Sequence, residues 1–513
     1  MKARNKGQVI IYLFTKQLLA VVVFLYLSVG AIFGQEFVLS GKGFGAEKTV
    51  SLNFYYATSP FPEIPITTEK DGTFKKVLSI PYSVFAFITC DGKSVRLLLS
   101  PGKHLQVIKN EDSIVFSGRG AAENRMLRND IFKEALFFAG HGADWKQNRY
   151  AYASKDTIER QVFRRAKREV DSGVAIITAN SKLSPTAKGI LISELRYYYQ
   201  LQLYEFCDNI LRWAKNKNRD YFLARALNWL PVPDGQQVRA CRPASFMLAN
   251  HCRNAIAKAS EVLRTDSIKG RRIIADLFGM TFDDITNKAQ NLGDSYIIWK
   301  YSRSHFNLPQ QEKILVDMIS FSNRLDDVHV TKALFDTLQR LYPRSCYVPT
   351  VKAMITNIEG RLSVGAANTN IHIYDTEKLT SLAALTGKHK NKIIYLDLWG
   401  TWCGPCINIM KHVPMVKKLF AGKDVVFAYL AMDEDDQESR WKNFIQVNTI
   451  EGEHYRLTNG QIQQIWKELG KDTEQQYPTY VLFDKTGKLV NTNAARPDEP
   501  GVLKQQIEQI LND

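Results

Sequence analysis

Cysteine is scarce in this sequence. Seven cysteines in 513 residues are an odd number, far below the density of a small disulfide-stapled exported domain. The fold is therefore not expected to depend on a disulfide framework, and isolated cysteines are most simply small buried apolar residues. The isolated cysteines are Cys90, Cys207, Cys241, Cys252 and Cys346.

The ligand spacing of a metal site is also missing. Cys241, His251 and Cys252 lie close together in the sequence, but their spacing fits no common zinc module. A metal held by Cys-x-x-Cys needs further ligands, and the sequence has a single motif of this kind. Covalent haem attachment would need histidine directly after that motif, where Ile407 stands. We therefore expect no metal, and no cofactor beyond the cysteine pair itself.

Acidic residues are fewer than basic ones, 52 against 68, which gives a net charge of +16. The net charge is +6 over residues 1–120, +11 over 121–350 and −1 over 351–513. A basic excess is found in proteins that bind nucleic acid or anionic membranes, and also on ordinary solvated helix faces. The basic stretch ERQVFRRAKREV at 159–170 fits contact with anionic lipid, but a solvated face is the simpler interpretation.

The first 34 residues combine four basic side chains with an uncharged run of 16 residues, Leu18 to Phe33. This pattern is typical of an export signal, so residues 1–34 are expected to be a cleaved signal peptide or an N-terminal membrane anchor. Because the positive end stays in the cytoplasm, the rest of the chain is expected in the periplasm or cell envelope. Nucleic acid is then not an expected partner, and membrane contact is expected through the N-terminal segment if it is retained.

Three further segments differ in the period of their apolar residues. Residues 35–118 alternate apolar and polar side chains between turn signals such as Asp71-Gly72, which predicts a small antiparallel β-domain. Residues 119–355 repeat apolar side chains at three and four positions, which predicts an α-helical domain. In residues 360–513 continuous apolar strands alternate with helices, which predicts an α/β domain whose sheet is covered on both faces. The chain is thus expected to be multidomain.

The Cys-x-x-Cys pair lies in this α/β segment. KIIYLDLWGTW ends a buried strand and CINIMKHVPMVKKL begins a helix, so Cys403 lies at the strand-to-helix turn and Cys406 in the first helical turn. Amides at a helix N-terminus stabilise an anion, and the thiolate is the nucleophile of disulfide exchange. The spacing lets Cys406 resolve a mixed disulfide formed by Cys403. Pro405 fits an early helix turn because its missing amide hydrogen would have no partner there.

Three other residues fit a redox pair. Asp397 lies in the middle of the buried strand, where its pKa should rise, so it is a candidate proton acceptor for Cys406. Pro478, in QQYPTYVLF, opens a strand whose backbone is available to an extended substrate segment. Trp402 is placed to shield the pair, although a tryptophan beside any strand end would look the same.

At these residues the chain resembles the thioredoxin-fold thiol-disulfide oxidoreductases, in particular the exported TlpA-like and ResA-like branch. The resemblance rests on YLDLWGTWCGPC, on the strand VVFAYLAMD and on YPTYVLFDKTGKLV, and it covers about residues 360–513. It implies a C-terminal thioredoxin fold with Cys403 as nucleophile and Cys406 as resolving thiol. It also implies that Asp397 is the buried acid and that Pro478 is a cis-proline facing the pair.

The resemblance has further implications around the site. Residues expected to contact the substrate are Trp402, Gly404, Pro405, Tyr477 and Thr479. The helix proline usual in the family is replaced by Lys411, and Pro414 comes three residues later, so any helix kink should be displaced. A lysine that thioredoxins often set beside the buried acid aligns with Tyr429. The earlier segments resemble an arrangement of exported Bacteroidota proteins in which a small β-domain and a helical middle precede the thioredoxin-like domain.

Together these features predict an exported thiol-disulfide oxidoreductase that exchanges disulfides with exported proteins. The dipeptide Gly404-Pro405 matches reducing thioredoxins, so we expect a reductase kept reduced by a membrane thiol electron donor. A disulfide oxidase or isomerase is the near alternative. An envelope binding or assembly protein with a structural cysteine pair is the alternative from another class, and a peroxidase would prefer a lone activated cysteine.

Overall fold

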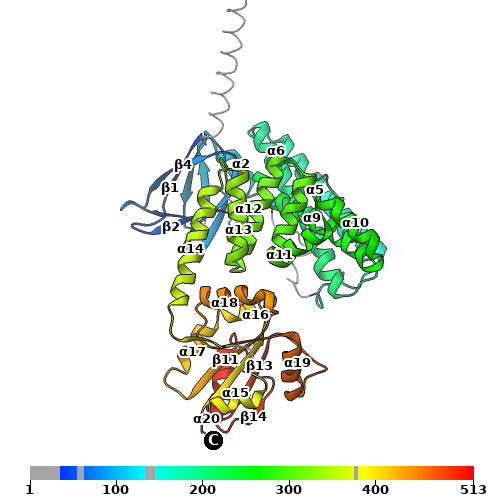
Figure 1. The fold of residues 1–513 in the computed structure, drawn as a ribbon. Coiled ribbons are helices and arrows are strands. Elements are labelled where there is room, and N and C mark those ends of the chain that lie inside the picture. Colours follow the sequence, from blue (N-terminus) through cyan, green and yellow to red (C-terminus); the bar gives the residue numbers. More distant parts are fainter. Residues whose placement is uncertain (1–34, 55–62, 112, 133–144, 375–378, 513) are drawn as a thin grey trace, which may run out of the picture. The chain divides into compact units, whose positions relative to one another are not determined.

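The chain is described here by a computed structural model. It describes residues 35–54, 63–111, 113–132, 145–374 and 379–512 (Figure 1). The expected signal peptide or membrane anchor at 1–34 lies outside the described residues. Within the described part of the chain, no helix is both long enough and apolar enough to span a membrane.

The N-terminal strands form two four-stranded sheets. The strands are β1 Gln35–Lys42, β2 Thr49–Phe54, β3 Ile64–Thr67, β4 Phe74–Ile80, β5 Val84–Cys90, β6 Lys93–Leu99, β7 His104–Lys109 and β8 Ile114–Ser117. Their orders are β4-β1-β7-β8 and β3-β2-β5-β6. Alternate residues of both sheets are buried in one shared apolar core, because successive side chains of a strand point to opposite faces.

The expectation of a purely antiparallel β-domain is wrong at one pairing. Strand β1 pairs antiparallel with β4 but parallel with β7, where Val38 lies opposite His104. A parallel pair needs a long connection, and the strands between β1 and β7 provide it. Alternation along a strand reports which face is buried, but it does not report the partner or its direction.

Helices occupy most of the described residues from 121 to 366. They are α2 Ala121–Met126, η2 Asp130–Phe132, α4 Lys155–Ile158, η3 Glu159–Phe163, α5 Arg164–Ala179, α6 Pro185–Glu205, η4 Phe206–Leu211, α7 Arg219–Leu227, α8 Gly235–Ala240, α9 Arg242–Thr265, α10 Ser267–Phe278, α11 Phe282–His305, α12 Leu308–Arg324, α13 Val328–Leu341 and α14 Val348–Ala366. Polar side chains cap the starts of several of them, including α4, α6, α8, α10 and α11. At α6, for example, the Ser184 side chain accepts a hydrogen bond from the Ala187 N–H.

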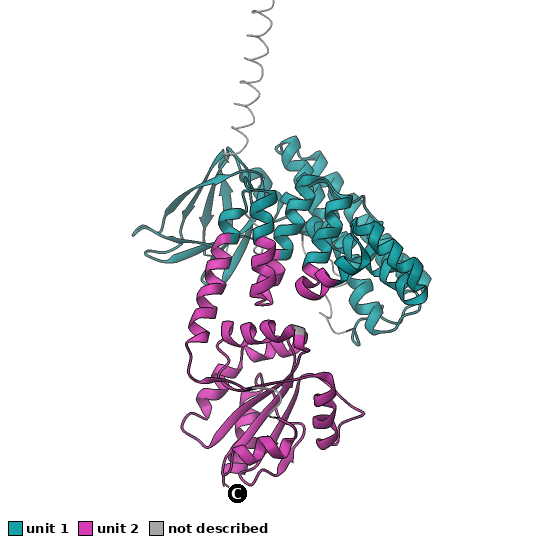
Figure 2. Cartoon of the chain, in the orientation of Figure 1, with its two compact units in different colours: residues 1–286, 296–318, 336–351 teal, residues 287–295, 319–335, 352–513 magenta. Residues whose placement is uncertain are grey.

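The chain divides into two compact units (Figure 2). The first comprises residues 1–286, 296–318 and 336–351, and the second comprises 287–295, 319–335 and 352–513. The second unit therefore takes stretches from inside the segment expected as one helical domain. Helix α14 also runs unbroken through residues 355–360, where the sequence pattern changes. Which helices pack together depends on contacts between distant residues, and a periodic pattern does not encode them.

The second unit contains a six-stranded sheet in the order β14-β13-β10-β11-β12-β9. The strands are β9 Ile371–Tyr374, β10 Ile393–Trp399, β11 Val425–Met432, β12 Gly452–Leu457, β13 Thr479–Phe483 and β14 Leu489–Asn491. Strands β9 to β12 pair in parallel, whereas β13 pairs antiparallel with β10 and β14. All residues of the central strand β10 are buried, as its continuous apolar run predicts.

Helices cover both faces of this sheet. They are α15 Leu382–Lys388, α16 Gly404–Met410, α17 Val413–Leu419, η6 Asp435–Gln437, α18 Glu438–Val447, α19 Asn459–Glu468 and α20 Pro500–Asn512. Helices α16, α17, α18 and α20 share a core with Tyr395 and Trp399, whereas α15 and α19 share one with Leu396 and Leu398. The helix expected from Cys406 onwards ends at Met410, and α17 starts separately with Pro414 in its first turn, where proline is favoured.

Candidate functional site

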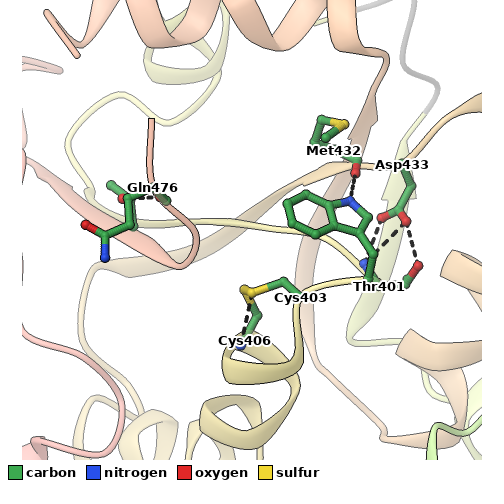
Figure 3. Close-up of a disulfide and its surroundings, with 8 residues drawn as sticks. Thr401, Cys403, Cys406, Met432, Asp433 and Gln476 are labelled. Atoms are coloured by element: carbon green, nitrogen blue, oxygen red, sulfur yellow. Dashed lines mark hydrogen bonds between the residues drawn. A yellow bond between two sulfur atoms is a disulfide. The ribbon is translucent and has the colours of Figure 1, made fainter. Parts of the chain in front are cut away.

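The cysteine pair lies where β10 leads into α16. Cys403 is the N-cap residue of α16, and Cys406 lies in its first turn. The two sulfur atoms form a disulfide, with a distance of 5.3 Å between the Cα atoms (Figure 3). Cys403 is 4% exposed and Cys406 is fully buried, so Cys403 is the sulfur nearer to solvent.

The first turn of α16 also provides a hydrogen-bond donor to the sulfur of Cys403. The backbone N–H of Cys406 donates to Cys403 Sγ over 3.2 Å. Pro405 stands in this first turn, where the N–H that proline lacks would have no partner within the helix. After reduction, an N–H group aimed at the sulfur stabilises its thiolate form.

Asp397 lies on the face of β10 that packs against α16. Tyr395 and Trp399, on the same side of the strand, share an apolar core with Cys406. Asp397 is 1% exposed, and neither carboxylate oxygen has a hydrogen-bond partner among the described residues. Burial raises the pKa of Asp397 well above its ordinary value.

A row of polar groups crosses this face of the sheet. Asp397 lies opposite Tyr480 of β13 and Tyr429 of β11, and Tyr429 lies opposite His454 of β12. The rings of Tyr429 and His454 stack with their centroids 4.6 Å apart. A tyrosine stands at the position aligned with the thioredoxin lysine, and among the described residues no positive charge offsets the effect of burial on the pKa of Asp397.

The segment before β13 lies beside the cysteine turn. The Tyr477–Pro478 peptide bond is cis. The ring of Tyr477 packs edge-on against Trp402, with the centroids 5.1 Å apart, and its hydroxyl accepts a hydrogen bond from Trp466 Nε1. Thr479 is mostly buried at the start of β13. The structure therefore brings Cys403, Trp402 and the proline segment together from parts of the chain more than 70 residues apart.

Trp402 is the exposed aromatic side chain of this site. It is 51% exposed, and its Nε1 donates a hydrogen bond to the carbonyl oxygen of Met432 over 2.7 Å. The indole is thus held by its polar edge to the end of β11. Its ring surface is available to a partner beside the cysteine pair.

Sequence reasoning missed Thr401 and Asp433. The backbone N–H of Thr401 donates to Asp433 Oδ2 over 3.1 Å, and Thr401 Oγ1 donates to Asp433 Oδ1 over 2.6 Å (Figure 3). Asp433 directly follows β11 and Thr401 comes two residues after the end of β10, and the carboxyl ends of neighbouring parallel strands meet at one edge of a sheet. That rule, applied to the polar residue after VVFAYLAM, was a signal that could have found Asp433.

The sheet order, the cysteine pair at the strand-to-helix turn and the adjacent cis-proline define a thioredoxin-fold dithiol protein. Residues 364–510 match the Redoxin family model. The thiol-disulfide oxidoreductase ResA of a Bacillus cereus strain is 30% identical over 153 residues, which are 29% of this chain and 78% of that protein. ResA of Bacillus anthracis matches to the same extent. The chain therefore belongs to the TlpA/ResA-like thiol-disulfide oxidoreductases and is a thioredoxin-like enzyme.

Among solved structures, the thioredoxin domain of a thiol-disulfide oxidoreductase from Bacteroides vulgatus is 20% identical to this chain. The match covers 25% of this chain and 84% of that one, with a TM-score of 0.21. The family match begins at residue 364. It therefore concerns the C-terminal part of the chain and assigns no function to the segments before it.

Proposed function

We propose that this enzyme exchanges disulfides with exported proteins in the cell envelope, with Cys403 as the nucleophile and Cys406 as the resolving thiol. The observation that carries the proposal is the position of the two sulfurs. They are bonded to each other at the start of a helix, and Cys403 is the one nearer to solvent. Only a thiolate that a substrate can reach is able to begin the exchange.

The proposed reducing cycle has two thiol-disulfide exchange steps. The Cys403 thiolate attacks one sulfur of the substrate disulfide, which forms a mixed disulfide and releases a substrate thiolate that takes up a proton. Cys406 then passes its proton to Asp397, and its thiolate attacks the sulfur of Cys403. The Cys403–Cys406 bond forms as the bond between Cys403 and the substrate breaks, and the second substrate thiolate takes up a proton while Asp397 gives its proton up. The substrate leaves as a dithiol that has gained two electrons and two protons.

Asp397 suits the second step because it is a buried carboxylate on the side of the sheet that faces Cys406. Its pKa is raised by burial, so it holds a proton more tightly than an exposed carboxylate does. The substrate chain would lie over the surface around the pair. We assign this contact surface to Trp402, Gly404, Pro405, Tyr477 and Thr479, together with the backbone before β13.

The direction and the location of the reaction are parts of the same proposal. Gly404-Pro405 supports a reducing pair, which a membrane thiol electron donor would regenerate. The basic residues and apolar run at the N-terminus support export to the envelope, as a periplasmic or membrane-anchored protein. The Cys403–Cys406 disulfide would be the redox group, with no further cofactor.

The reduction potential of the pair in the full chain tests the direction. The protein would be equilibrated in glutathione buffers, trapped with an alkylating reagent and digested, and the oxidised fraction of the Cys403–Cys406 peptide would be measured by mass spectrometry. We expect a value near that of reducing thioredoxins, about −270 mV.

Other outcomes would favour the alternatives. A value near that of strong oxidants, about −120 mV, would make the enzyme a disulfide donor. A pair that never exchanges, together with a Cys403→Ser variant that keeps its function, would favour an envelope binding or assembly protein with a structural disulfide.

A further inference from the structure

A buried carboxylate holds the turn that carries Trp402 and Cys403. Asp433 is 1% exposed, and its two oxygens accept hydrogen bonds from both the N–H and the hydroxyl of Thr401 (Figure 3). The longest of these contacts, from Thr401 N to Oδ1, measures 3.3 Å. Charge-assisted hydrogen bonds of this kind are stronger than those between neutral groups. Asp433 is therefore a firm anchor for residue 401.

The neighbouring residue Met432 anchors the next residue of the same turn. Its carbonyl oxygen accepts the hydrogen bond of Trp402 Nε1 over 2.7 Å. Gly400 leaves room for this contact, because a Cβ atom there would lie 2.5 Å from Trp402 Nε1 and 3.0 Å from the Met432 oxygen. The N–H of Cys403 donates to the Gly400 carbonyl over 3.0 Å, which closes the turn. The end of β11 thus holds in place the residues that directly precede the reactive sulfur.

Charged groups from two further elements face Asp433. Arg456 of β12 donates to the Asp433 carbonyl oxygen over 3.0 Å and to Asp435 over 2.8 Å. The charges of Arg440 in α18 and of Arg456 favour the ionised form of Asp433. The hydrogen bonds from Thr401 have the same effect. Tyr477, in the segment before β13, also faces Asp433. Burial outweighs these effects and raises the pKa of Asp433 to about 6.

We propose that Asp433 is a positioning residue for disulfide exchange, whose ionised carboxylate fixes Thr401 and thereby the geometry of Trp402 and Cys403. This inference rests on the proposed role of Cys403 as nucleophile. An ionised carboxylate accepts both Thr401 hydrogen bonds, whereas a protonated one carries a hydrogen of its own on one oxygen. The turn is held in its reactive geometry when Asp433 is ionised, and exchange slows when Asp433 takes up a proton.

The test compares the wild type with Asp433→Asn, an isosteric change that removes the ionisation. The reduced full chain would react with oxidised glutathione that carries two self-quenching fluorophores, and the second-order rate constant would be measured between about pH 5 and 8. The Cys403 thiolate would be titrated by its absorbance in the same samples, and rates would be expressed per thiolate. We expect wild type to exceed Asp433→Asn about tenfold at pH 8, as for a misplaced reacting group.

The pH dependence separates positioning from a merely structural role. The ratio of the two rates should fall to about 2 at pH 5, with its midpoint near pH 6, because most of the wild-type Asp433 is then protonated as well. A ratio of 1 throughout, or a ratio that does not change with pH, would overturn the proposal. Asp435→Asn is the matched control, because this exposed carboxylate also bonds Arg456 but does not contact Thr401, and it should leave the rate unchanged.

Two further variants complete the test. Thr401→Val removes the hydroxyl donor and keeps the backbone N–H. If the contact between Asp433 and Thr401 positions the turn, the exchange rate of this variant should be about threefold lower than that of the wild type at pH 8. If Asp433→Asn fails to fold, Thr401→Val takes its place in the test. An unaltered rate in a folded Thr401→Val would then contradict the proposed role of Asp433. Cys403→Ser should abolish exchange. Activity retained in Cys403→Ser would contradict the proposed function itself, a result that none of the Asp433 or Thr401 outcomes can produce.

Discussion

Asp397 introduces an ionisable group into a strand that is buried on both faces. The carboxyl group has neither an opposite charge nor a hydrogen-bond donor in the described structure to stabilise its ionised form. Its pKa in the folded state is therefore raised above the unfolded value of about 3.9. From about pH 4 upward, until Asp397 ionises in the folded state, that state binds more protons than the unfolded state. The free energy of unfolding falls as pH rises through this window and stays lower above it.

Replacing Asp397 by asparagine should therefore stabilise the protein in a pH-dependent way. We expect the free energy of unfolding of Asp397→Asn to exceed that of the wild type by about 1 to 3 kcal/mol at pH 8, because the cost of an unpaired buried charge is removed. The difference should vanish below about pH 3, where the wild-type group is neutral in both states. Denaturant unfolding of the oxidised protein at the two pH values measures it.

The control for this prediction is the exposed carboxylate Asp424, just before β11. Asp424→Asn should change the free energy of unfolding by less than about 0.5 kcal/mol at either pH, as is usual for a surface substitution. A wild type more stable than Asp397→Asn at pH 8 would show that Asp397 finds a stabilising partner when ionised.

The same Asp397→Asn variant should accumulate the mixed disulfide, because Cys406 should resolve that disulfide about a hundredfold more slowly in this variant.

At the scale of elements, two glycines of α14 face different surroundings. Gly365 is buried, and a Cβ atom there would overlap the carbonyl oxygen of Gln446 in α18. Gly360 lies on the exposed side of the same helix, and a Cβ atom there would meet nothing within 4 Å. Close approach of the two helices thus requires glycine at 365, whereas Gly360 only weakens the helix.

The two alanine variants should therefore shift stability in opposite directions. Gly365→Ala is expected to lower the free energy of unfolding of the second unit by about 1 to 3 kcal/mol, through overpacking. Gly360→Ala should raise it by up to about 1 kcal/mol, the difference in helix propensity. Thermal unfolding of both variants beside the wild type measures the shifts. A decrease of equal size in both variants would contradict the packing of α14 on α18.

At the scale of the whole molecule, the cysteines are divided between the two units. The five thiols that the structure describes as free all lie in the first unit, and the disulfide lies in the second. Four of the free thiols are buried, and Cys346 is half-buried. Burial raises the pKa of Cys252 to about 12 and that of Cys346 to about 11, which leaves little reactive thiolate at neutral pH.

After mild reduction at neutral pH, alkylation of the native full chain should therefore occur at a single position. We expect Cys403 to be labelled at least about ten times faster than any other cysteine, since the others are buried or hold their protons. Digestion and mass spectrometry give the extent of labelling at each site, and unfolding in urea should expose all seven cysteines equally. Rapid labelling of Cys346 in the folded protein would contradict this division.

Much of the secondary structure and the central features of the site could be predicted from the sequence, because they depend on local patterns. The continuous apolar run around Asp397 predicts a doubly covered strand, and the turn into CINIM places Cys403 at a helix start. The break before α17 also has a local cause in Pro414. These properties depend on side-chain periodicity and backbone chemistry within a few residues.

The tertiary structure decided what joins distant residues. It paired β1 with β7 in parallel, set Tyr429 and Tyr480 on either side of Asp397, and divided the helices between two units. It also brought Asp433 against Thr401, which lies 32 positions earlier. Such pairings depend on strand order and on helix packing, which are decided by the competition among many buried contacts. By itself, the sequence determined the chemistry of the cysteine pair, and the fold decided which groups hold that pair in place.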